Sequence, residues 1–101
     1  MKIRVVVVDD FPLVRDGVAR ALDSDPAIEV VGQAGTGREA LALAEELEPD
    51  VMTLDLRMPD VGGLAVLDKL RTSQPGIRVI VMTASEQASA LLDAIAAGAA
   101  G

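Results

Sequence analysis

Short apolar runs alternate with longer amphipathic stretches along this chain, and the alternation constrains the fold more than any other feature. Four apolar runs predict strands, at residues 3–8, 28–34, 51–56 and 78–83. The first reads IRVVVV and is rich in β-branched residues, which is typical of a strand buried on both faces. Strands of this kind belong to parallel sheets whose faces are covered by helices.

The amphipathic stretches predict a helix after each strand, at residues 12–22, 38–48, 64–71 and 84–98. Pro12 suits the first turn of the first helix, and Gly98 suits the C-terminal end of the fourth. Thr36 and Glu39 have the spacing of a capping box at the start of the second helix. Strand and helix therefore alternate along the whole chain, with short connections.

This order predicts one α/β domain over residues 1–101, built on a doubly wound parallel sheet with right-handed crossovers. A doubly wound sheet needs helices on both faces, so we expect a fifth strand and helix to follow the point where this sequence ends. The chain is long enough for one modest core, which must be aliphatic because Phe11 is its single aromatic residue.

Composition argues against several classes of function. A net charge of −7 and the lack of aromatic stacking platforms disfavour nucleic-acid or anionic-membrane binding by this segment. The absence of histidine and cysteine excludes imidazole catalysis, disulfides and thiolate metal sites. No signal peptide or bilayer-spanning run is visible, so we expect a cytoplasmic protein without membrane contact.

Polar side chains gather where the predicted strands end. Asp9 and Asp10 follow the first strand, Asp55 lies near the end of the third, and Thr83 ends the fourth. Open α/β sheets bind ligands at these carboxyl ends, at the point where the strand order reverses. In the flavodoxin-like order 2-1-3-4, that switch point lies between the first and third strands, directly over the acids.

Three clustered carboxylates raise one another's pKa values or recruit a cation, and an all-oxygen ligand set favours Mg²⁺. A magnesium ion beside an aspartate suits phosphoryl transfer, with the carboxylate as nucleophile and the Thr83 hydroxyl bonding a phosphoryl oxygen. Two plainer interpretations stay open at this point. Asp9 and Asp10 can cap the following helix, and Thr83 can serve packing in its strand.

The segments VVVVDDFPLVRDGVARAL, VMTLDLRMPDVGGLAVLDKLR and VIVMTA together resemble the receiver domain of bacterial two-component response regulators. The first segment and EVVGQAGTGREAL are most similar to the NarL/FixJ-like (LuxR-type) branch. The resemblance implies that Asp55 is the phosphoacceptor and that Thr83 is the switch hydroxyl. It also implies a Mg²⁺ site made by Asp10 directly, Asp9 through a water molecule, Asp55, and the backbone carbonyl of Arg57.

Further details follow from the same resemblance. Met58, Pro59 and Gly63 are expected to shape the loop after the third strand, and the small Ala84 to leave room for the phosphoryl group. Members of the family carry a lysine and a switch aromatic residue on a fifth strand, which these 101 residues do not include.

The resemblance implies a signalling switch rather than an enzyme with an external substrate. A sensor histidine kinase would donate the phosphoryl group, the receiver would form a homodimer, and transcription would be regulated through a DNA-binding effector domain outside this chain. One alternative is a degenerate or truncated receiver that binds proteins independently of phosphorylation. An aspartyl-phosphate phosphatase is less favoured, because such enzymes carry a second acid where this chain has Arg57.

Overall fold

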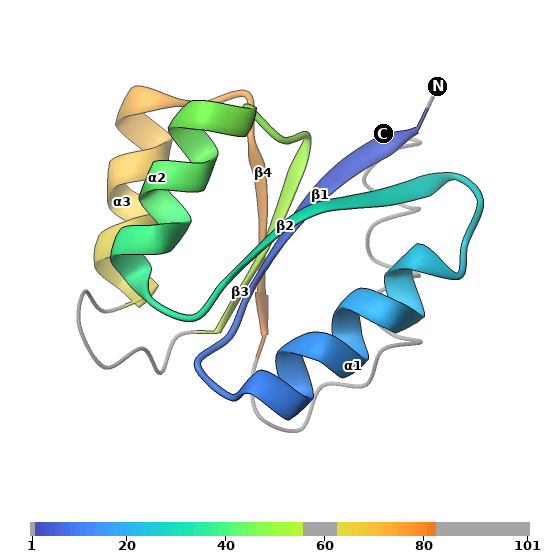
Figure 1. Cartoon of the computed structure of the whole chain (residues 1–101). Coiled ribbons are helices and arrows are strands. Elements are labelled where there is room, and N and C mark those ends of the chain that lie inside the picture. The colour runs from blue at the N-terminus through green and yellow to red at the C-terminus, as the bar shows by residue number, and fades with distance from the viewer. Residues whose placement is uncertain (1, 56–62, 83–101) are drawn as a thin grey trace.

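The described part of the chain is a four-stranded parallel sheet with helices on both faces. The computed structural model describes residues 2–55 and 63–82. Its elements in chain order are β1 (Ile3–Val8), α1 (Pro12–Asp23), β2 (Ile28–Ala34), α2 (Gly37–Leu47), β3 (Val51–Asp55), α3 (Gly63–Ser73) and β4 (Arg78–Met82). The strand order is β2-β1-β3-β4, and all three pairings are parallel. Helix α1 covers one face, whereas α2 and α3 cover the other (Figure 1). The predicted doubly wound, flavodoxin-like sheet is confirmed.

The predicted element boundaries agree with the structure to within two residues wherever the described residues include them. Gly63, which we expected in the loop before the third helix, is instead the first residue of α3. Residues 56 and 83, at the ends of two predicted strands, lie outside the described residues. The predicted fourth helix, at 84–98, also lies outside them.

The predicted capping box at the start of α2 is present in a modified form. The side-chain oxygen of Thr36 accepts a hydrogen bond from the Glu39 backbone N–H at 3.1 Å. Glu39 Oε1 accepts in return from the Gly35 backbone N–H and from the Thr36 hydroxyl, each at 3.3 Å. These bonds hold the connection between β2 and α2 at the carboxyl edge of the sheet.

The valines of β1 divide the core into two aliphatic layers. Val5 and Val7 pack on the side of α1 with Leu22, while Val6 and Val8 pack on the side of α2 and α3. All four valines are at most 1% exposed, and burying each side chain contributes about 1.5–3 kcal/mol. Because β1 lies between β2 and β3, its carboxyl end is held on both sides.

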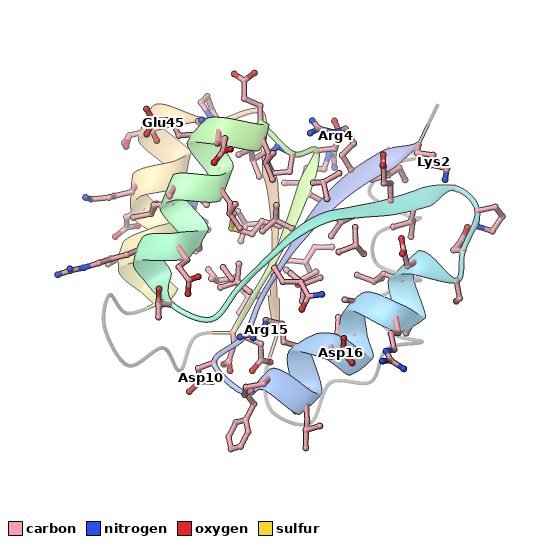
Figure 2. The ribbon with its side chains drawn as sticks, viewed as in Figure 1. Lys2, Arg4, Asp10, Arg15, Asp16 and Glu45 are labelled. Carbon is pink, nitrogen blue, oxygen red and sulfur yellow. The ribbon has the colours of Figure 1, made fainter. Side chains whose placement is uncertain are left out.

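Helix α2 ends earlier than predicted because Glu48 turns the chain into the left-handed region. Its φ and ψ are 46° and 60°. Arg4, at the opposite edge of the sheet from the strand carboxyl ends (Figure 2), secures this turn. Its Nη1 donates to the carbonyl oxygens of Leu47 at 2.7 Å and of Glu48 at 3.2 Å. A left-handed conformation costs a residue with a Cβ roughly 1 kcal/mol.

Glu48→Gly is expected to stabilise the domain, because glycine adopts the left-handed conformation without a steric penalty. We expect a gain of about 0.5–1 kcal/mol, seen by calorimetry as a rise of a few degrees in Tm. Ala42→Gly, at an exposed position in the middle of α2, is the matched control and should lower stability by about 1 kcal/mol. A Glu48→Gly protein that melts at or below the wild-type temperature would refute this account of the helix end.

Candidate functional site

Three carboxylates meet at the carboxyl edge of the sheet, between the two central strands. Asp9 follows β1 directly, and Asp55 is the last residue of β3. Val8 pairs with Leu54 in the parallel register, so the next residues of the two strands are neighbours. Each of Asp9, Asp10 and Asp55 offers a carboxylate oxygen, and these oxygens lie within 4.8 Å of one another. The structure therefore brings together the three acids predicted from the sequence.

The three acids differ in burial. Asp9 is 7% exposed and Asp55 is 6% exposed, whereas Asp10 is the more exposed member of the cluster. Figure 2 shows Asp10 beside the start of α1, at the same end of the sheet as Arg15. The two acids at the strand ends, Asp9 and Asp55, are thus buried, and solvent reaches the cluster through Asp10.

Asp9 is fixed by hydrogen bonds from three directions. Its N–H donates to the carbonyl oxygen of Ala34 at 3.0 Å, and its carbonyl oxygen accepts from Arg15 Nη1 at 3.0 Å. Its side-chain Oδ1 accepts from the backbone N–H of Phe11 at 2.9 Å, which closes a local turn. Phe11 is the N-cap residue of α1 and forms no side-chain cap. The side chain of Asp9 therefore bonds the N-cap residue itself and not an N–H of the first helical turn, so helix capping does not account for its position.

Burial raises the pKa of the Asp9 carboxyl above its ordinary value. The hydrogen bond from the Phe11 N–H opposes this shift, the charges of Asp55 and Asp10 add to it, and the charge of Arg15 opposes it. The negative form of Asp9 is thus disfavoured by desolvation and by its like-charged neighbours. A cation among the three acids relieves both penalties, and oxygen ligands alone suit a hard divalent ion. The residues present fit the Mg²⁺ site expected from the sequence.

Asp9→Asn is expected to stabilise the metal-free protein at pH 7. A raised pKa in the folded state means that the ionised carboxyl destabilises the fold above that pKa, while asparagine preserves the acceptor for the Phe11 N–H. In EDTA, Asp9→Asn should therefore have a higher Tm than wild type at pH 7. This difference should shrink as the pH falls through the folded-state pKa of Asp9 towards the ordinary aspartate range.

Asp68→Asn, at an exposed position on α3, is the control and should change Tm little at any pH. An Asp9→Asn protein less stable than wild type at pH 7 in EDTA would contradict the electrostatic penalty assigned to Asp9.

Several predicted site residues belong to the parts of the chain that the structure does not describe. Arg57 and Thr83 lie outside the described residues, as do the loop and neighbouring residues Met58, Pro59 and Ala84. Their roles stay predictions. One residue of the site was not singled out from the sequence: Arg15 contacts the backbone of Asp9. The available signal was its position on the first turn of a helix that begins beside the acids.

The fold and the acidic cluster together are those of a signal receiver domain. The chain belongs to the response regulator receiver domain family, whose match covers residues 5–101. The resemblance found in the sequence is thereby confirmed. Among the described residues, no helix is both long enough and apolar enough to cross a membrane.

Individual relatives place the chain with NarL/FixJ-type regulators. The response regulator GacA of Pseudomonas aeruginosa is 48% identical over 99 residues, which are 98% of this chain and 46% of GacA. DevR/DosR of Mycobacterium tuberculosis, a DNA-binding transcriptional activator, is 40% identical over 99 residues, again 98% of this chain and 46% of the relative. The chain therefore spans slightly less than half the length of these curated relatives.

A solved structure matches the chain over almost its whole length. The signal receiver domain of the response regulator NarL from Mycobacterium tuberculosis superposes with a TM-score of 0.91 at 33% identity. The match covers 99% of this chain and 98% of that one. Over this length the chain therefore has the fold of that receiver domain.

Proposed function

We propose that this domain is the phosphoacceptor switch of a two-component response regulator, and that it accepts a phosphoryl group on Asp55 with the help of Mg²⁺. The observation that carries the proposal is the convergence of Asp9, Asp10 and Asp55 within 4.8 Å at the switch point of the sheet. Membership of the receiver family supports it. The domain spanning residues 1–101 would be one part of a longer regulator.

Asp55 suits the role of nucleophile better than the other two acids. It ends β3, which is paired on one side with β1 and on the other with β4, where Asp55 lies opposite Met82. The backbone of Asp55 is therefore paired with β4, and the residue before it, Leu54, is paired with Val8 of β1. Asp9 and Asp10 both belong to the turn after β1 rather than to a strand.

In the proposed reaction, a carboxylate oxygen of Asp55 attacks the phosphorus of a phosphohistidine on a sensor kinase. The phosphorus–nitrogen bond breaks, and the ring nitrogen keeps the electron pair; because the other ring nitrogen carries a proton, the leaving group is neutral imidazole. An acyl phosphate forms on Asp55. When bound, Mg²⁺ offsets the negative charge of the carboxylates and of the phosphoryl oxygens. Asp10, Asp9 and the Arg57 carbonyl would join Asp55 in holding the ion, and the Thr83 hydroxyl would meet the phosphoryl group.

The downstream part of the proposal rests on the relatives. A cytoplasmic regulator that dimerises and controls transcription through an effector domain agrees with DevR/DosR, a DNA-binding transcriptional activator of about twice this length. Neither alternative from the sequence gains support. The acids of the site converge, as phosphorylation requires, and position 57 holds arginine rather than the second acid of the phosphatases.

Incubation with acetyl phosphate and Mg²⁺, followed by intact-mass spectrometry, tests the proposal. The wild-type protein should gain the mass of one phosphoryl group, and EDTA should abolish the gain because the carboxylates then lack their counter-charge. Asp55→Asn should show no adduct, whereas Asp68→Asn, at an exposed position in the middle of α3, should be modified like wild type. An adduct that persists in Asp55→Asn, or a folded wild-type protein that forms none, would refute the proposed function.

A further inference from the structure

Arg15 reaches from the first turn of α1 back to the turn that carries the two adjacent acids. Its Nη1 donates a hydrogen bond to the carbonyl oxygen of Asp9 at 3.0 Å. That carbonyl belongs to the same planar peptide unit as the N–H of Asp10. A bond that fixes the plane of this unit therefore also fixes the direction in which the chain enters Asp10.

Gly35 provides the space that the Arg15 guanidinium occupies. A Cβ at position 35 would lie 2.6 Å from Nη1 and 3.7 Å from Cζ of Arg15, closer to Nη1 than side chains tolerate. The φ of Gly35 is not positive, so its backbone conformation is open to any residue. A side chain at this position would therefore have to displace the Arg15 guanidinium.

The guanidinium lies where two connections meet. The turn between β1 and α1 is joined to β2 by the hydrogen bond from the Asp9 N–H to the Ala34 carbonyl. The next residue, Gly35, donates its N–H to Glu39 of the α2 capping box. Arg15 is half-buried against this junction, and its Nη1 donates to the carbonyl oxygen of Asp9. The backbone that Arg15 contacts is therefore itself fixed by the Asp9–Ala34 and Gly35–Glu39 hydrogen bonds.

We propose that Arg15, admitted by Gly35, is a positioning residue of the phosphoacceptor site, which holds the Asp9–Asp10 peptide so that Asp10 faces Asp55 in a geometry that binds a divalent cation. This inference rests on the proposed function, because it gives Arg15 a part in the same site. Arg15 touches the backbone beside the acids and none of the reacting atoms. A guanidinium also supplies positive charge, so the test must separate geometry from charge.

Two substitutions make this separation, with Mg²⁺ affinity measured by calorimetry. Arg15→Gln should weaken binding roughly tenfold, as loss of a group that orients metal ligands does. Gly35→Ala keeps the positive charge of Arg15 but displaces its Nη1 from the Asp9 carbonyl oxygen, so it should show a similar loss. The methyl group of Gly35→Ala displaces the end of a flexible side chain, so this variant should stay folded. Wild-type affinity in either Arg15→Gln or Gly35→Ala would overturn the inference.

Matched controls come from the outer side of α1. Gly17→Ala places its methyl group in open space, with no atom within 4 Å, and should leave Mg²⁺ affinity unchanged. Arg20→Gln removes an exposed arginine that pairs with Asp16 at 3.0 Å, and it should likewise have no effect. The double variant Arg15→Gln/Gly35→Ala should bind Mg²⁺ no more weakly than Arg15→Gln, because the clash partner is gone. Additive losses would contradict the shared mechanism.

A second measurement reads the hydrogen bond without metal. In EDTA, the Asp10 amide signal in ¹H–¹⁵N NMR spectra should shift in Arg15→Gln and in Gly35→Ala but not in Gly17→Ala. An unmoved Asp10 signal overturns the inference even if the wild-type protein binds Mg²⁺. A wild-type protein that binds no Mg²⁺ would refute the proposed function, and the Asp10 signal then decides the positioning part by itself.

Discussion

The mutual repulsion of three carboxylates is the constraint on which this structure depends. Asp9 and Asp55 are almost fully buried, and a buried negative charge is unfavourable unless hydrogen bonds or opposite charge compensate it. Parallel pairing of β1 with β3 leaves the two strands no freedom to move these residues apart. The aliphatic core packs against both faces of these strands. The fold thus maintains a concentration of negative charge that a divalent cation can neutralise.

Most of the fold could be predicted because each local signal agreed with the others. β-branched runs marked the strands, amphipathic stretches marked the helices, and the alternation of the two required parallel pairing. Helix ends were less predictable. Glu48 has no sequence signal for a left-handed conformation, which arises where Arg4 holds the carbonyls at the end of α2. Contacts between residues 44 positions apart decide such a boundary, and local patterns do not contain them.

The acids of the site were predictable for a different reason: parallel strands that end together bring together whatever residues follow them. Asp9, Asp10 and Asp55 therefore follow from topology alone. The role of Arg15 does not follow from topology, because it depends on the direction of the Asp9 carbonyl and on the space left by the missing side chain of Gly35. Both are properties of the assembled turn. Sequence patterns thus identified the charged groups, and the structure was needed to show what orients them.

If the three acids form one divalent-cation site, Mn²⁺ should reveal it most directly, because Mn²⁺ prefers the same oxygen ligands and broadens nearby NMR signals. Substoichiometric Mn²⁺ should first broaden the amide signals of Asp9, Asp10 and Asp55, and excess Mg²⁺ should restore them. Broadening that instead centres on the exposed acids Glu45 and Glu46 of α2, or that Mg²⁺ fails to reverse, would contradict the account.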